Sequence, residues 1–423
     1  MCELVHKFIG KKSVENGIWL YLLQIFNTII PIMTLPYITR VLHPSEYGEV
    51  TIAINILGYF QAIVEYGFGM SATRKVALLG SHNNNNEDDI NRIFSGILYS
   101  RFILFLFCFI ITVLYLLIGN NSDRRGMCLL ILNTTLIGNV LQLNWLFQGK
   151  QDMKFISISN IIARIAVVVG IFMLVKSPDD IYLYCILTAL SPIIASILGL
   201  FVARKKYRVA VIRLNFHEIL DELKSGWYVF TTQLSAKVFS GIGITFLGMW
   251  STSYEVGIYS AVQKIPYMLT LAWNPISQVL YPISSRNILN SQYEGIKFVN
   301  RIRKYTLLVF GCGAIICGIL APFVVRIAFG KGYLNGVHLI YPLLVWVILG
   351  INNNFLGIQI LLGSGHDKEY SKCFQIGVIC TILLNALLIY FFHSTGAAIA
   401  PMISEVILGI LLCINVRCLR IRS

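Results

Sequence analysis

Residues 95–118 read SGILYSRFILFLFCFIITVLYLLI, and Arg101 is the one charged residue among them. A helix needs about 20 predominantly apolar residues to cross the hydrocarbon core of a bilayer. The stretch is long enough, and its apolar residues are continuous rather than alternating, which argues against a strand of a membrane β-barrel. The sequence here predicts a transmembrane helix.

The rest of the chain repeats this pattern. The 423 residues are 56% hydrophobic and only 13% charged, more apolar surface than a soluble domain can bury. The first apolar stretch follows three lysines, as in a signal peptide, but it is too long and lacks a small-residue cleavage site. We therefore predict an all-α integral membrane fold with twelve spanning helices. Their windows are residues 17–39, 48–70, 95–118, 127–148, 155–175, 181–203, 226–250, 256–283, 304–328, 337–362, 373–392 and 396–416.

The positive charges predict how these helices are oriented. If both termini are cytoplasmic, the cytoplasmic segments hold 24 Lys and Arg residues and the opposite side holds 5. This asymmetry is the positive-inside pattern of multi-pass proteins. It accounts for the net charge of +14 without nucleic acid, so no nucleic-acid partner is expected. The ten cysteines lie mostly in apolar windows, so we expect no disulfide framework, metal site or cofactor.

An internal repeat divides the chain. The tripeptide Asn-Arg-Ile occurs at residues 91–93 and again at 300–302, an offset of 209. The same offset relates Gly48 to Gly257 and Pro192 to Pro401, although one tripeptide alone could recur by coincidence. Six helices per half is an even number, so both halves enter the membrane from the same side. We predict an N-lobe over 1–203 (helices 1–6), a cytoplasmic linker over 204–225 and a C-lobe over 226–423 (helices 7–12).

The linker carries its own helical signal. Its apolar residues Phe216, Ile219, Leu220 and Leu223 recur at helical spacing among polar residues. This pattern predicts an amphipathic helix lying on the cytoplasmic surface.

Charged residues inside the windows are the candidate site. Ionisable groups within a span are costly and mark substrate or ion pathways. Arg164, Lys237 and Lys264 lie well inside their windows, and we expect them to line a water-accessible cavity. Two further cations, Arg101 and Arg326, lie nearer helix ends, where snorkelling to the interface is equally open. With only Glu65 and Glu405 as embedded carboxylates, the cavity is expected to attract anions.

Polar side chains share helical faces with these cations. Asn160 precedes Arg164 by one turn, Gln233 precedes Lys237 by one turn, and Asn139 lies three residues before Gln142. Each Asn or Gln could instead form an ordinary hydrogen bond between helices. Guanidinium and ammonium groups suit phosphate or pyrophosphate, and amide faces suit hydroxyl groups. The lining therefore indicates an anion attached to sugar.

Four segments carry a family resemblance: LPYITRVLHPSEYGEV (35–50), YGFGMSATRKVA (66–77), NWLFQGKQDMKFISISN (144–160) and VGIYSAVQKIPYM (256–268). They resemble the polysaccharide-transporter branch of the MOP superfamily and, more narrowly, Wzx-type O-antigen flippases. The resemblance implies two pseudo-symmetric six-helix lobes in the bacterial inner membrane. Arg40 and Arg74 fall in its "TR" and "TRK" segments and join the substrate-binding candidates. His43 departs from the pattern, because Gly is common there.

The activity implied by the resemblance is transport without chemistry. Members move undecaprenyl-pyrophosphate-linked O-antigen units from the cytoplasmic to the periplasmic leaflet, and the mechanism expected is alternating access. Glu65 and Glu405 are the candidate ion-coupling residues, for a proton or sodium. Membrane lipid, the O-antigen polymerase and the chain-length regulator are the other partners considered.

Two other functions stay open. A MATE-like ion-coupled exporter of small molecules would need an acidic cavity, and a membrane polysaccharide polymerase would need a long outward loop. We predict no catalytic residues, because no nucleophile–base pair, metal cluster or Gly-rich phosphate loop stands out.

Overall fold

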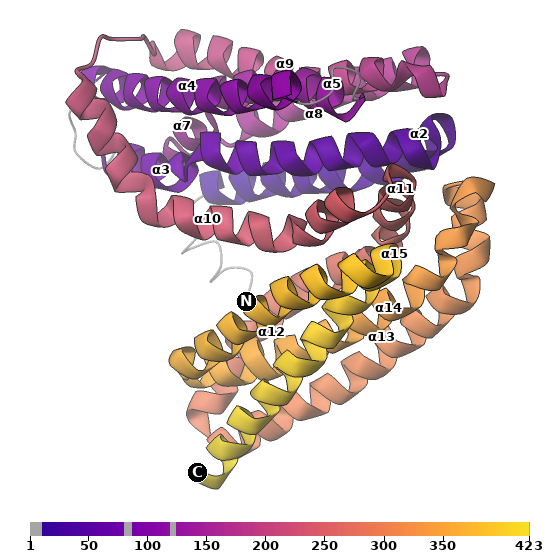
Figure 1. The fold of residues 1–423 in the computed structure, drawn as a ribbon. Coiled ribbons are helices and arrows are strands. Elements are labelled where there is room, and N and C mark those ends of the chain that lie inside the picture. The colour runs from indigo at the N-terminus through magenta and orange to yellow at the C-terminus, as the bar shows by residue number, and fades with distance from the viewer. Residues whose placement is uncertain (1–10, 80–86, 119–123, 423) are drawn as a thin grey trace. The chain divides into compact units, whose positions relative to one another are not determined.

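A computed structural model describes residues 11–79, 87–118 and 124–422 of the chain (Figure 1). Every regular element within these ranges is a helix, which confirms the all-α expectation. Eight helical segments are long and apolar enough to cross a membrane, by length and composition. The first and last of them, Glu15–Leu79 and Asp367–Arg417, each contain two of the predicted windows. Windows seven and eight lie in further helices, so the helices are consistent with twelve spans.

The chain forms two compact units, Met1–Leu42 with Glu49–Ser240, and His43–Gly48 with Gly241–Ser423. The boundary between them lies inside a helix, at residues 240–241, and not in the polar connector at 204–225. The first unit contains most of α2 (Lys11–Glu65), all of α3 (Phe68–Leu79), α4 (Glu87–Ile118), α5 (Arg124–Asn133), α6 (Thr135–Leu141), α7 (Asn144–Gly149), α8 (Lys154–Leu174), η1 (Pro178–Asp180) and α9 (Ile181–Tyr207), and most of α10 (Phe216–Trp250). Its core gathers Phe68, Trp145 and Phe147, each almost fully buried.

Several predicted spans are not simple rods. Windows one and two join without a loop, and α2 turns at His43, whose φ of 59° is left-handed. Window four is divided into α5, α6 and α7, with an extended residue at Gln142. The break at Gln142 lies within a predicted span, where exposed backbone carbonyls need a partner.

The connector between the halves is shorter than the sequence indicates. The helix α9 continues to Tyr207, and α10 begins at Phe216 and runs without interruption to Trp250. The predicted amphipathic helix therefore forms, but it is the first part of the seventh span rather than a separate surface helix.

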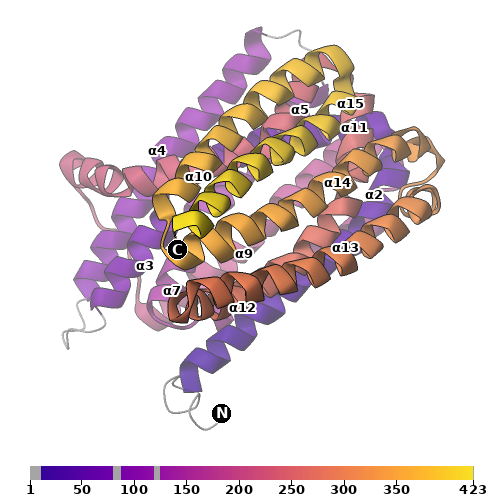
Figure 2. The same cartoon turned by 90° about the horizontal axis from the view of Figure 1, so that it is seen from below.

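The second unit contains α11 (Ser253–Val262), α12 (Lys264–Asn290), α13 (Gln292–Ala328), η2 (Lys331–Gly336), α14 (Val337–Asn354), the π-helix η3 (Phe355–Leu361), η4 (Leu362–Ser364) and α15 (Asp367–Arg422). Figure 2 shows α12, α13 and α14 running side by side. Its core is built around Trp273 and Phe355, whose ring centroids lie 5.1 Å apart. Like α2, α15 contains two windows and turns at a histidine, His393, with φ of 48°.

Two glycines of the sequence repeat meet each other. A Cβ on Gly48 would lie 1.8 Å from the carbonyl oxygen of Ser253, and a Cβ on Gly257 would lie 1.9 Å from the carbonyl oxygen of Pro44. Gly48 and Gly257 are 209 residues apart, and so are Pro44 and Ser253. The contact of Gly48 with Ser253 and the contact of Gly257 with Pro44 are therefore equivalent under the repeat. Such reciprocal contacts are expected at a two-fold axis.

Candidate functional site

Three of the predicted charged residues come together in the first unit. Glu65 ends α2, and the charges of Arg101 on α4 and Lys237 on α10 both act on its carboxylate. The Lys237 side chain lies over Gly58, where an added Cβ would be 2.4 Å from its Cε and 2.9 Å from its Nζ. Gly58 lies on α2, the helix that Glu65 ends, and its missing side chain leaves room for the ammonium group of Lys237 from α10.

Arg101 is held in the core of this unit rather than at an interface. It is 3% exposed, and its Nη1 donates to the carbonyl oxygens of Asn139 at 3.0 Å and Gln142 at 2.8 Å. These carbonyls belong to the broken C-terminal end of α6, where a cation and a donor are both favourable. The guanidinium also lies 5.9 Å from the centroid of the Phe68 ring. Arg101 therefore supports the break in the fourth span.

Asn139 and Gln142 contact Arg101 through backbone oxygens and not through their amides. Among the described residues, the buried Nδ2 of Asn139 is one of the polar atoms without a hydrogen-bond partner. Gln142 and Asn160 line a cavity of about 10 Å³, about the volume that one water needs. Asn160 donates to the carbonyl oxygen of Ile156 at 2.8 Å in its own helix.

The remaining predicted residues of this unit are placed as follows. Arg164 is half-buried on α8, one turn after Asn160, and Gln233 is half-buried on α10, one turn before Lys237. Arg40 on α2 and Arg74 on α3 are exposed.

In the second unit, Glu405 is reached through a chain of hydrogen bonds. Asn353 donates from Nδ2 to the Glu405 Oε2 at 2.6 Å and to its backbone oxygen at 2.7 Å. Asn352 donates to the Oδ1 of Asn353 at 3.2 Å, and Arg303 donates to the Oδ1 of Asn352 at 2.9 Å. The chain connects α13, α14 and α15. Lys264 is exposed at the start of α12, directly after Gln263 interrupts the predicted eighth span.

Sequence reasoning missed the three consecutive asparagines at 352–354. Successive residues of a helix point about 100° apart, so three in a row face three directions. Asn352 meets α13, Asn353 meets α15, and Asn354 accepts from Ser277 of α12 at 2.8 Å. The π-helix η3 follows at Phe355, and π-bulges are frequent at functional sites. The signal was visible as INNNFLG at 351–357 inside an otherwise apolar window.

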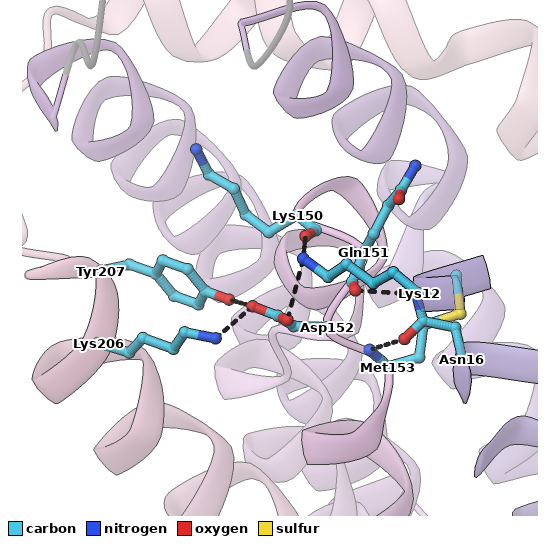
Figure 3. A network of polar contacts seen from close by, with 8 residues as sticks. All are labelled: Lys12, Asn16, Lys150, Gln151, Asp152, Met153, Lys206 and Tyr207. Atoms are coloured by element: carbon cyan, nitrogen blue, oxygen red, sulfur yellow. Dashed lines mark hydrogen bonds and ion pairs between the residues drawn. The ribbon is translucent and has the colours of Figure 1, made fainter. Parts of the chain in front are cut away.

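A second missed cluster surrounds Asp152, outside the predicted spans (Figure 3). Asp152 accepts hydrogen bonds from Lys206 and Tyr207 at the end of α9, and Lys12 of α2 lies 3.4 Å from its Oδ1. Burial alone raises the pKa of Asp152, but the two hydrogen bonds and the charges of Lys206 and Lys12 outweigh it, so this pKa lies below its ordinary value. Burial and the Asp152 carboxylate raise the pKa of Tyr207, which keeps its hydroxyl proton for this bond.

Asn16 extends the same cluster. Its Nδ2 donates to the carbonyl oxygen of Gln151 at 2.8 Å, and its Oδ1 accepts from the backbone N–H of Met153 at 3.1 Å. Gln151 has φ of 54°, so the connection between α7 and α8 is held in a left-handed turn. Figure 3 shows these bonds converging on the α7–α8 connection from the start of α2 and the end of α9. The cluster joins three helix ends within one unit.

We expect Asp152→Asn to lower the melting temperature of the purified chain at pH 7, because it removes a carboxylate that holds two cations and a hydroxyl. The loss should be about 1.5–3 kcal/mol, the usual range for hydrogen bonds to a charged group. Since the folded pKa is depressed, this stability is present above the ordinary pKa of about 3.9 and disappears as pH falls through the lower folded value. Melting in detergent at pH 7 measures it. Asp179→Asn, at an exposed aspartate of η1, is the matched control and should change nothing.

Within the described residues, no group of three or more His, Cys, Asp and Glu side chains is arranged to hold a metal ion.

Comparisons with known proteins agree with this architecture. Residues 13–288 match the family model described as "Polysaccharide biosynthesis protein". The chain is 27% identical over 403 residues to a protein of Escherichia coli K12 named "Putative O-antigen transporter", covering 95% of this chain and 96% of that one. A protein of the same name from Shigella dysenteriae is 26% identical, over 93% of this chain and 97% of its own length.

Two solved structures share the fold at 13% identity. "Lipid II flippase MurJ, inward closed conformation" has a TM-score of 0.71 and covers 96% of this chain and 88% of its own. An inward-facing MATE family multidrug transporter of the MOP superfamily has a TM-score of 0.65, and the match covers 93% of this chain and 99% of that one. These similarities confirm the expected fold class.

Proposed function

The chain belongs to the family of polysaccharide biosynthesis proteins, and we propose that it is a flippase for undecaprenyl-pyrophosphate-linked O-antigen units. It moves them from the cytoplasmic to the periplasmic leaflet of the bacterial inner membrane, with both termini in the cytoplasm. No bond is made or broken. The names of the two bacterial relatives support this cargo, and the fold shared with a lipid flippase supports the process.

The observation that carries the proposal is the position of Lys237. It lies eleven residues after Gly226, the start of the seventh predicted window, which is about 16 Å along a helix and so near the middle of an approximately 30 Å hydrocarbon core. It is nevertheless exposed, and Gly58, two turns before Glu65 on α2, leaves space for it. An exposed ammonium at this depth requires water or an anion, because a charge facing acyl chains is costly.

We infer that the cargo and the Glu65 carboxylate compete for this ammonium. Without cargo, Lys237 and Arg101 supply positive potential at the Glu65 carboxylate. A pyrophosphate that draws Lys237 toward itself removes part of that potential, and Glu65 then takes up a proton or a sodium ion. Binding at one group is thereby linked to uptake at the other, as alternating access by a coupled carrier requires. Glu405, bonded to Asn353, is the second candidate for ion uptake.

We expect Lys237→Gln to lower O-antigen export about tenfold or more, because hydrogen bonds to a charged group contribute about 1.5–3 kcal/mol. Gly58→Ala should lower export less, because it only displaces the far end of the flexible Lys237 side chain. The alanine keeps the charge but occupies the space of the Lys237 side chain. Export is measured as surface O-antigen in a strain without its own copy, with protein level measured in the same cells.

Gly17→Ala is the matched control on the same helix, because nothing lies within 4 Å of a Cβ there. Export at the normal level from Lys237→Gln, with normal protein abundance, would remove Lys237 from the site and with it the main support for this function.

A further inference from the structure

An apolar groove of about 590 Å³ lies between α13 and α14, which run side by side in Figure 2. Its α13 wall consists of Gly311, Ala314, Ile315, Gly318 and Ile319. Its α14 wall is the equivalent face of residues 341–349. The spacing of both walls is that of a single helix face. The groove exists because Gly311, Ala314 and Gly318 lack the side chains that would fill the space between the helices.

The groove opens toward the surroundings of the helix pair. Ile315 is 64% exposed, Ile319 is 74% exposed, and nothing lies within 4 Å of a Cβ on Gly311. The hydroxyl of Tyr341 is the one polar side-chain group among the lining residues. Both helices are predicted spans, and a groove with an almost wholly apolar lining suits an acyl chain.

Cations continue the groove face of α13 toward the end of the helix that is predicted to be cytoplasmic. Lys304 lies seven residues before Gly311, which is two turns and nearly the same direction, and Arg301 lies one turn further. Both side chains are exposed. The groove therefore ends at an ammonium and a guanidinium, which complement a phosphate.

The length of this face matches one leaflet. Lys304 and Ile319 are 15 residues apart, or about 22 Å at about 1.5 Å per residue. One leaflet with its headgroup is about 20–22 Å thick, half of a bilayer of about 40–45 Å. A lipid with its phosphate at Lys304 would end its chain beside Ile319, near the midplane. An isoprenoid chain longer than a leaflet would extend beyond the groove.

We propose that this groove binds one acyl chain of an anionic phospholipid of the cytoplasmic leaflet, with the lipid phosphate held by Lys304 and Arg301. The lipid fills the gap left by the small residues and joins α13 to α14. This site is separate from the cargo site and does not depend on the proposed function.

The test measures lipid binding to the purified full-length chain. Native mass spectrometry in detergent is run with phosphatidylglycerol and with phosphatidylcholine of the same acyl chains. The wild-type chain should retain phosphatidylglycerol with about tenfold preference, a difference of about 1.4 kcal/mol. Gly311→Phe, which fills the groove from open space, should lose this binding. Arg301→Gln with Lys304→Gln should reduce the preference to nothing while keeping weak binding of both lipids.

Matched controls separate the groove from the rest of the surface. Ile316→Phe adds the same ring to an exposed position of α13 outside the groove, and Lys368→Gln with Lys372→Gln removes two exposed cations from α15. Both should bind as the wild type does. Full retention by Gly311→Phe, or equal binding of the two lipids by the wild type, would overturn the proposal. Displacement of the phospholipid by equimolar undecaprenyl phosphate would also overturn it, by assigning the groove to the cargo lipid. If the wild-type chain forms a dimer that Gly311→Phe abolishes without a change in lipid binding, the groove would be assigned to a second copy of the chain.

Discussion

Gly48→Ala and Gly257→Ala are each expected to prevent normal accumulation of the folded protein. A Cβ at either position would lie less than 2 Å from a backbone carbonyl oxygen, that of Ser253 or of Pro44. A backbone oxygen cannot swing away as a side chain can, so the two chain segments must separate. Overpacking in a close-packed interior costs about 1–3 kcal/mol and occasionally more, and we expect the upper end here. Fluorescence-detected size exclusion of a tagged chain, followed by thermal melting, measures the loss.

The controls are glycines that have space around them. Gly17→Ala and Gly311→Ala place a Cβ where nothing lies within 4 Å, and both should accumulate normally. The double variant at Gly48 and Gly257 should be less damaging than the sum of the two single variants, because both changes separate the same two segments. Wild-type melting of either single variant would show that the chains do not approach this closely.

This contact also shows how far the sequence alone could lead. The bilayer forces every backbone polar group in a span to be satisfied internally, so long apolar runs predict helices well. The offset of 209 residues predicted that Gly48 and Gly257 are equivalent, and the reciprocal contact with Pro44 and Ser253 supports that equivalence. Composition could not predict that the two equivalent turns meet, because that depends on tertiary packing.

The interruptions of the spans were beyond the sequence for a related reason. Hydropathy averages over about 19 residues, so the break at Gln142 does not change it. The turns at His43 and His393 have a left-handed backbone, but neither position is a glycine, the residue that usually indicates such a turn. The start of α10 at Phe216 was predictable from its periodicity, but its continuation into the seventh span was not, because no helix breaker marks the membrane surface there.

Embedded charge selected the candidate site residues from the sequence, but it did not predict what each of them contacts. Glu65, Arg101 and Lys237 were selected because charge is rare in a span, and the structure brings all three together. Which of them is accessible depends on burial, and burial distinguishes Arg101 from Lys237. The asparagines at 352–354 were overlooked because each amide alone has an ordinary explanation, whereas their adjacency is the informative feature.

Arg101→Met is expected to destabilise the purified chain by about 1–3 kcal/mol, the usual cost of leaving buried hydrogen-bonding groups without their partner. Methionine has a similar length but leaves the carbonyls of Asn139 and Gln142 without their donor. It also removes one of the two positive charges that act on Glu65. Thermal melting in detergent checks this, and Arg74→Met, at an exposed arginine of α3, is the control.

The double variant Arg101→Met with Glu65→Gln separates the two contributions. If compensation of the Glu65 charge dominates, the second change restores most of the melting temperature, because no buried carboxylate remains. If the two carbonyl bonds dominate, the double variant melts like Arg101→Met, and Arg101→Lys, with its more compact donor group, restores only part of the loss. If Arg101→Met melts like the wild type, neither the carbonyl bonds nor the compensation of the Glu65 charge stabilises the chain. Arg101 would then be a candidate for binding an anion.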